Sequence, residues 1–162
     1  MSHSLSPELH RFRSVATNFI QTVDSAAQME RDPFLTRIGH CLAELYSTAL
    51  HLPPVAPDTT TVTDRSPVKD ELEELFHSIR QKIGPLDEYW EIFDATAKDA
   101  PVQGSIALDI SEIYLDLKED LYNVEQRASR NDFLWTLRFS FRSHWGTHLL
   151  GALKAIHDRH VE

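Results

Sequence analysis

The sequence predicts an all-α protein, a five-helix bundle in a single domain over residues 1–162, from two observations. First, an N-capping residue followed by proline marks three helix starts: Ser6-Pro7, Asp32-Pro33 and Ser66-Pro67. Proline is tolerated at the first helical position because its missing N–H would have no partner there. Second, apolar residues recur with the period of an α-helix after each start, whereas no segment has a convincing strand pattern.

The first three helices are expected over residues 6–28, 32–52 and 66–84. Each has one apolar face. In the first helix this face is formed by Leu9, Phe12, Ala16 and Phe19, and in the second by Leu35, Ile38, Leu42 and Leu45. In the third helix it is formed by Leu72, Leu75, Phe76 and Ile79. Gly84-Pro85 ends the third helix, because glycine favours the position after a helix and proline cannot continue one.

Two irregular segments interrupt this pattern. Residues 53–65 hold three prolines and a run of threonines, which indicates an exposed loop. Residues 85–104 form an aromatic-containing segment with Tyr89, Trp90 and Phe93. We expect a short helical or extended piece there that is pinned to the bundle, followed by a loop.

The last two helices are expected over residues 105–126 and 131–160. The fourth helix carries apolar residues on two nearly opposite sides, which is typical of a central helix. The fifth is apolar almost all round, so most of it should be buried. Gly146 and Gly151 lie inside the fifth helix, where a close approach of another helix would explain them.

The charge of the chain is acidic and unevenly distributed. Lys and Arg number 16 against 25 Asp and Glu, which gives a net charge of -9. Nucleic acid is therefore an unlikely partner, because phosphate neutralisation needs clustered basic residues. Residues 70–125 carry a net charge of -11 and residues 126–162 carry +3, which predicts that the last two helices pack antiparallel and pair their charges.

The sequence also bears on location. The single cysteine, Cys41, cannot form an internal disulfide, which fits a reducing compartment. The first residues lack the apolar run of a signal peptide, and no window approaches the 18 or so apolar residues of a membrane span. We therefore expect a cytoplasmic protein with no membrane contact.

Acidic and histidine side chains on the last two helices form the first candidate site. Asp109, Glu112 and Asp116 share one side of the fourth helix, and His144 and His148 share one side of the fifth. Imidazole and carboxylate together suit zinc, iron or manganese, so these five residues are candidate metal ligands of a metal-dependent hydrolase. The alternative is a buried histidine pair that only hydrogen-bonds the acidic side of the fourth helix.

Arg138 falls on an apolar side of the fifth helix, between Leu134 and Phe141. A buried cation needs a partner, so we expect Arg138 to pair with a carboxylate of the fourth helix. Trp135 and Trp145 are expected mainly in the core.

A second candidate site is an aromatic groove. It would be lined by Tyr89, Trp90, Trp135 and Trp145 and would bind a peptide or a small ligand. The alternative is that these aromatic residues pin the irregular segment to the core.

Two segments carry a resemblance to a known family, SIALDISEIYLDLKE from Ser105 and WTLRFSFRSHWGTHL from Trp135. Together with Tyr89-Trp90, they resemble the bacterial domain-of-unknown-function family numbered 5063. The family's signature positions would map to Asp109, Tyr114, Asp116, Lys118, Arg138, His144, Trp145 and His148. The resemblance implies a cytosolic bacterial helical domain whose signature residues form one polar cluster, and it implies no particular activity, substrate or cofactor.

The leading functional hypothesis is a non-enzymatic accessory or protein-interaction domain, because no recognised catalytic motif is present. The alternatives are the metal-dependent hydrolase and the aromatic ligand groove. No cofactor is expected unless the five candidate ligands hold a divalent metal. The sequence identifies neither the protein partner nor the oligomeric state.

Overall fold

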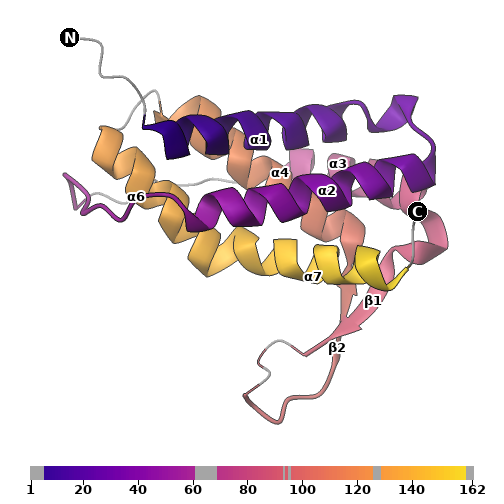
Figure 1. Cartoon of the computed structure of the whole chain (residues 1–162). Helices are drawn as coiled ribbons and strands as arrows, with labels where there is room; N and C mark the ends of the chain where they lie inside the picture. Colours follow the sequence, from indigo (N-terminus) through magenta and orange to yellow (C-terminus); the bar gives the residue numbers. More distant parts are fainter. Residues whose placement is uncertain (1–5, 61–68, 93, 95, 126–128, 160–162) are drawn as a thin grey trace.

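Helices make up most of the computed structural model, and a small β-hairpin projects from one side of the bundle (Figure 1). The structure describes residues 6–60, 69–92, 94, 96–125 and 129–159. Within these residues the helices form five rods: α1, α2, α3, α4 continued by η3, and α6, η4 and α7 in one line. None of the described helices is long and apolar enough to cross a lipid bilayer.

Helices α1 (Pro7–Asp24) and α2 (Arg31–Leu50) pack side by side and are joined through the short 3-10 helix η1 (Ala26–Gln28) (Figure 1). The Ser6 hydroxyl caps α1 by accepting the Leu9 N–H at 3.3 Å, as the Ser-Pro pattern predicts. Asp32 is not the N-cap of α2. Glu30 holds that position, and Asp32 lies in the first turn, where it pairs with Arg31.

The chain after α2 runs along the N-terminal end of α6, the first helix of the last rod. The carboxylate of Asp58 accepts hydrogen bonds from Ser129 at 2.6 Å and Asn131 at 2.9 Å. In return, Asp132 accepts the backbone N–H groups of Asp58 and Thr59. The described part of the predicted 53–65 loop is therefore a loop tied to the N-terminus of α6.

Helix α3 (Lys69–Ile83) leads through η2 (Gly84–Leu86) into the hairpin. Gly84 has a φ of 63°, which is the left-handed conformation that glycine adopts most easily. The predicted cap of α3, Ser66, lies outside the described residues.

The hairpin consists of β1 (Glu88–Glu91) and β2 (Val102–Ser105), paired antiparallel with Tyr89 opposite Gly104. The expectation that the chain contains no strand is wrong here, so the fold is predominantly helical rather than all-α. Each strand is only four residues long, which is too short for a clear alternation of apolar and polar residues. Contacts with the helices, described below, hold the hairpin in place.

Helix α4 (Ile106–Lys118) continues into a π-helical turn, η3 (Glu119–Val124). The last rod consists of α6 (Arg130–Ser140), a π-helical turn η4 (Phe141–Trp145) and α7 (Gly146–Asp158). Serine side chains cap both rods, Ser105 for α4 and Ser129 for α6. A π-turn is wider than an α-turn, so it rotates the residues after it relative to those before it.

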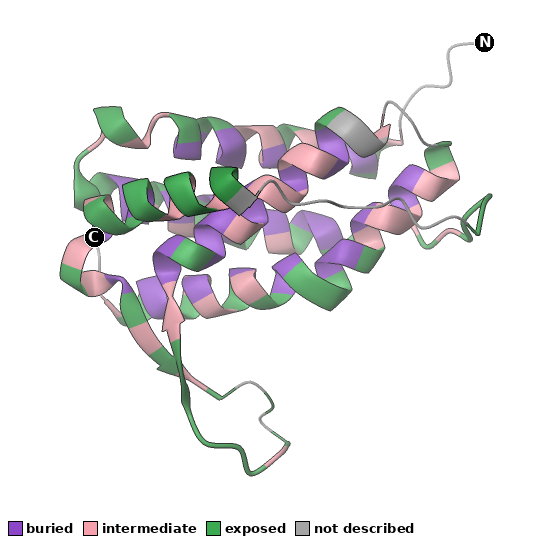
Figure 2. Cartoon of the chain, turned by 180° about the vertical axis from the view of Figure 1, so that it is seen from behind, coloured by how far each residue is buried: buried purple, intermediate pink, exposed green. Residues whose placement is uncertain are grey.

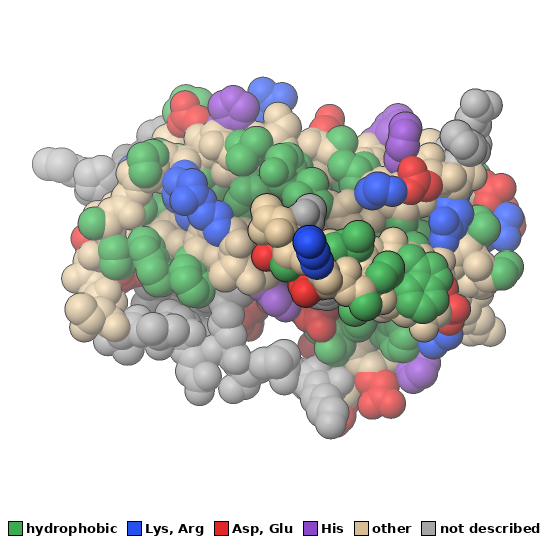
Figure 3. All heavy atoms as spheres, turned by 90° about the horizontal axis from the view of Figure 1, so that it is seen from below, with side chains coloured by type: hydrophobic (Ala, Val, Ile, Leu, Met, Phe, Trp, Pro, Cys, Tyr) green, Lys and Arg blue, Asp and Glu red, His purple; other side chains and the backbone are tan. Residues whose placement is uncertain are grey.

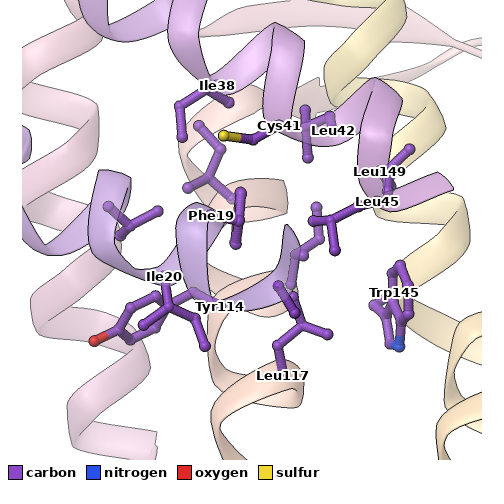
Figure 4. Close-up of a cluster of buried hydrophobic side chains, with 14 of the residues drawn as sticks. Phe19, Ile20, Ile38, Cys41, Leu42, Leu45, Tyr114, Leu117, Trp145 and Leu149 are labelled. Carbon is purple, nitrogen blue, oxygen red and sulfur yellow. The ribbon is translucent and has the colours of Figure 1, made fainter. Parts of the chain in front are cut away.

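The core lies between these rods and is formed by apolar side chains of α1, α2, α3, α4 and the last rod. Figure 2 shows buried positions along each of these rods. The close-up shows Phe19, Leu45, Leu117, Trp145 and Leu149 pointing into this shared interior (Figure 4). Helix α4 contacts α1, α3 and α7, which places it centrally, as its two apolar sides predict.

Three polar side chains are buried where the two π-turns meet. The Ser140 hydroxyl donates to Asp120 at 2.9 Å and accepts the Trp145 indole N–H at 3.2 Å. Asp120 and Trp145 are both fully buried, so the hydroxyl replaces water that neither group can reach.

We expect Ser140→Ala to lower the free energy of unfolding by about 1–3 kcal/mol, because it removes a hydrogen bond from both buried neighbours. Ser143→Ala is the matched control, since Ser143 is exposed on the same rod and should change stability by less than about 0.5 kcal/mol. Urea unfolding followed by circular dichroism measures both. Equal stability of the two variants would contradict the role given to Ser140.

Candidate functional site

The buried carboxylate of Asp109 joins the hairpin to α4 and α7. The Tyr89 hydroxyl donates to one oxygen at 2.6 Å, and Nδ1 of His148 lies 2.8 Å from the other. Asp109 is only 5% exposed, and a buried carboxylate is tolerated where hydrogen bonds replace its water. We call Tyr89, Asp109 and His148 the Asp109 cluster.

Two glycines make room for the Tyr89 side chain in this cluster. A Cβ atom at Gly104, opposite Tyr89 on β2, would lie 2.5–2.8 Å from atoms of the phenol ring. A Cβ atom at Gly151 on α7 would collide with the Tyr89 hydroxyl. Gly151 therefore admits a tyrosine of the hairpin rather than another helix, which corrects the explanation expected from the sequence. Gly146 makes room for Phe141 of the same rod.

A second histidine–carboxylate pair lies one turn away. Nδ1 of His144 is 2.7 Å from Asp116, and its Nε2 is 4.0 Å from Glu112. The rings of His144 and His148 meet edge to face, with centroids 4.8 Å apart. Because Asp109 pairs with His148 and Asp116 with His144, α4 and α7 run antiparallel, as predicted.

A recess of about 440 Å³ opens beside this cluster, between the hairpin, the start of α4 and the last rod. Figure 3, which looks at the molecule from below, shows red acidic and purple histidine side chains bordering a hollow near the middle of that face. The polar residues that line the recess include Arg80, Asp87, Glu88, Glu91, Asp109, Ser143, His144, Thr147 and His148. We call this cavity the recess.

Asp87 fixes one wall of the recess. Its buried carboxylate accepts the Ser105 hydroxyl at 2.8 Å and the Ala107 backbone N–H at 2.7 Å. It thereby satisfies an N–H group at the start of α4 that has no partner inside the helix. Sequence reasoning did not single out this residue, because Asp87 is 20 residues from the Ala107 N–H that it binds and so carries no local capping signal.

Burial shifts the ionisation of the carboxylates around the recess. Removal from water raises the pKa of Asp109 above its ordinary value, against the lowering effect of the His148 and Tyr89 hydrogen bonds. The pKa of Glu91 is raised by burial and then by the nearby Asp109 charge. The pKa of the Tyr89 hydroxyl is also raised, first by burial and then by its hydrogen bond to Asp109.

The five candidate metal ligands are brought to the same side of α4 and α7, but as two separate pairs. Among the residues that the structure describes, no group of three or more His, Cys, Asp or Glu side chains is arranged to hold a metal ion. Each imidazole does present Nδ1 to a carboxylate, which is how metal-binding histidines are commonly oriented. A divalent metal at these residues stays a prediction, and elemental analysis of the purified protein tests it.

Arg138 does not pair with the carboxylates of α4 and is not part of this site. Its guanidinium donates to the Leu52 carbonyl beyond the end of α2. Arg138 already lies on a different side of the rod from His144 and His148 when about 100° is counted per residue. The π-turn η4 then changes the helical period after Ser140.

Three other predicted site residues also lie elsewhere. The Tyr114 hydroxyl donates to Asp24 of α1 at 2.6 Å, and Lys118 lies over the Tyr114 ring and near Glu71 of α3. Trp145 is in the core, as expected. The residues that the family resemblance singles out in the sequence therefore do not form one cluster.

The aromatic groove predicted from Tyr89, Trp90, Trp135 and Trp145 does not exist as one site. Tyr89 points into the bundle, whereas Trp90 on the same strand is 70% exposed. Trp135 stacks on Phe139 of α6, with ring centroids 5.0 Å apart. Tyr89 thus pins the hairpin, as the alternative supposed, and Trp90 does not.

The fold and the site define a predominantly helical domain with a hairpin anchored to its last rod. The chain belongs to the family described as "Domain of unknown function (DUF5063)", whose model matches residues 3–162. The resemblance seen in the sequence is thereby confirmed.

The fold is also similar to that of a solved structure. The crystal structure of protein BF1032 from Bacteroides fragilis superimposes with a TM-score of 0.80 at 22% sequence identity, over 96% of this chain and 93% of that one. No curated protein matches the sequence.

We expect Tyr89→Phe to raise the pKa of Asp109 further, because the lost hydrogen bond favours the charged carboxylate. Since the raised pKa already favours the protonated native state, the stability contributed by Asp109 is present at low pH and is lost as pH rises through that pKa. Carbon-13 NMR titration of the carboxyl measures the shift. Tyr114→Phe is the control, since Tyr114 bonds Asp24, and an unshifted Asp109 in Tyr89→Phe would contradict the assignment.

Two helical glycines allow a matched test of the space for Tyr89. Gly39→Ala should stabilise the protein by about 1 kcal/mol, because alanine favours helix and its Cβ meets only Ile156 at 3.4 Å. Gly151→Ala should instead destabilise by about 1–3 kcal/mol, because its Cβ displaces the Tyr89 hydroxyl. Thermal unfolding compares the two, and stabilisation by both substitutions would show that Tyr89 moves away freely.

Proposed function

We propose that this protein is a non-catalytic protein-interaction domain of the cytosol, which binds its partner through the hairpin and the adjoining side of α7. The observation that carries the proposal is the exposure of Trp90 at 70% on a hairpin that the protein holds in a fixed position. Exposed tryptophan is uncommon on a surface that has no partner, and it is enriched among residues that dominate binding energy.

Other apolar side chains extend the surface around Trp90. Ile92 is 52% exposed on the hairpin, and Leu150 is 48% exposed on α7. A groove of about 770 Å³ runs between the two elements and is lined by these residues and by Pro101. We call Trp90, Ile92, Leu150 and this groove the hairpin surface. Its aromatic and aliphatic anchors, with charged residues at the margin, match the composition of protein interfaces.

The Asp109 cluster has a supporting role in this proposal. A two-stranded hairpin is marginally stable in water by itself, and each strand here is four residues long. The Tyr89–Asp109 hydrogen bond and the capping of α4 by Asp87 fix its base. Because the hairpin is already fixed in the free protein, it loses little conformational entropy when a partner binds to Trp90. This small entropy cost favours affinity.

A photo-crosslinking amino acid in place of Trp90 tests the proposal in the cells that make the protein. Benzoylphenylalanine at position 90 should give a covalent adduct with one defined protein. The same residue at Phe139 is the matched control, because Phe139 is another exposed aromatic side chain, 54% accessible on α6. It should give no adduct with that protein.

The affinity for the captured partner then shows how much Trp90 contributes to the binding free energy. Trp90→Ala should weaken binding by about 2 kcal/mol or more, as for an anchor residue, and Phe139→Ala should leave it unchanged. Adducts of equal yield from both positions, or tight binding by Trp90→Ala, would overturn the proposal.

A further inference from the structure

We propose that the segment that docks on the hairpin surface carries a lysine or arginine, whose cation binds in the recess against Glu91. This inference rests on the interaction function proposed above and adds the chemistry of the partner. It makes the recess the specificity pocket of the same interface.

Glu91 is the residue that points to a cation. It is partly buried on β1, and its carboxylate lies against α7, where it would be 3.2 Å from a Cβ at Gly151. Within the described part of the chain, the Glu91 carboxylate makes no hydrogen bond or ion pair, whereas the Glu88 carboxylate is bonded by Arg80 and Gln103. A partly desolvated carboxylate gains most from a cation that supplies the missing bonds.

His148 provides a second acceptor beside Glu91. A carboxylate accepts hydrogen bonds, so Nδ1 of His148 donates to Asp109, and the tautomer with its proton on Nδ1 leaves Nε2 as an acceptor. Nε2 has no partner among the described residues, and His148 lines the recess. An ammonium or guanidinium group carries several N–H donors and no acceptor, and therefore satisfies both Glu91 and His148.

The charge around the hairpin favours the same partner. Residues 87–105 include five acidic residues and one lysine. Arg80, the basic side chain that lines the recess, lies within 3.0 Å of Glu88 and 3.8 Å of Asp87. Complementary charge speeds association and rejects acidic partners.

The recess and the groove of the hairpin surface adjoin each other. Glu88, Glu91 and Thr147 line both of them. Neighbouring residues of one extended segment can therefore place an apolar side chain on Trp90 and a basic side chain in the recess. A volume of about 440 Å³ holds a lysine or arginine head group together with part of its aliphatic stem.

A phage-displayed random peptide library, selected on the purified full-length protein, tests the partner chemistry. Wild-type protein should enrich peptides in which a lysine or arginine adjoins a large apolar residue. Glu91→Gln, which keeps the shape and removes the charge, should enrich the apolar residue without the basic one. Glu44→Gln is the matched control, because Glu44 is an exposed glutamate of α2 that lines neither the recess nor the groove, and it should enrich the same peptides as wild type.

Calorimetric titration of the best peptide separates the two proposals. Glu91→Gln should bind about tenfold more weakly than wild type, and Glu44→Gln about equally. If Trp90→Ala loses binding and Glu91→Gln does not, the cation site is wrong and the interaction surface stands. If Trp90→Ala binds as tightly as wild type, or if no peptide is enriched, both proposals fail.

Agmatine, a guanidinium on a short aliphatic stem, probes the recess without any peptide. NMR titration should shift the ring signals of His148 in wild type and in Glu44→Gln, and not in Glu91→Gln. Agmatine that leaves His148 unshifted in wild type would overturn the cation site, whatever the peptides show.

Discussion

The hydrogen-bonded burial of Asp109 is the constraint on which the rest of the site depends. A carboxylate at 5% exposure is costly unless donors replace its water, and here the donors come from two other elements. Tyr89 reaches it from the hairpin and His148 from α7. Both reach it only because Gly104 and Gly151 leave space for the phenol. One buried charge therefore fixes the position of a hairpin that is too short to be stable alone.

The fixed hairpin explains why the candidate surface lies where it does. Successive side chains of a strand point to opposite faces, so a strand that buries Tyr89 exposes Trp90. Glu91, the next residue, turns back toward α7 and lines both the recess and the groove. The polar cluster and the apolar surface are thus two sides of one strand. This arrangement makes the histidine–carboxylate pairs the support of a binding surface in our proposal.

The residues that the family resemblance singles out serve different purposes in the fold. Asp109 and His148 hold the hairpin, Tyr114 bonds Asp24 of α1, and Arg138 bonds the carbonyl of Leu52. These contacts each join elements that are distant in the sequence. The split arises from helical phase, because Asp109 and Tyr114 are five residues apart on α4 and therefore point to different sides of it. On the last rod, the π-turn η4 also changes the direction in which later side chains point, and a count at about 100° per residue does not include that change.

Local physical chemistry in the sequence determined the helices, because caps, prolines and apolar periodicity act within a few residues. It also determined the central place of α4 and its antiparallel pairing with α7 through Asp109, Asp116, His144 and His148. Tertiary structure alone decided the hairpin, the partner of Arg138 and the roles of Asp87 and Glu91. Those features depend on contacts between distant segments, such as the space that Gly151 leaves for Tyr89. Such contacts produce no periodic pattern of residues in the sequence.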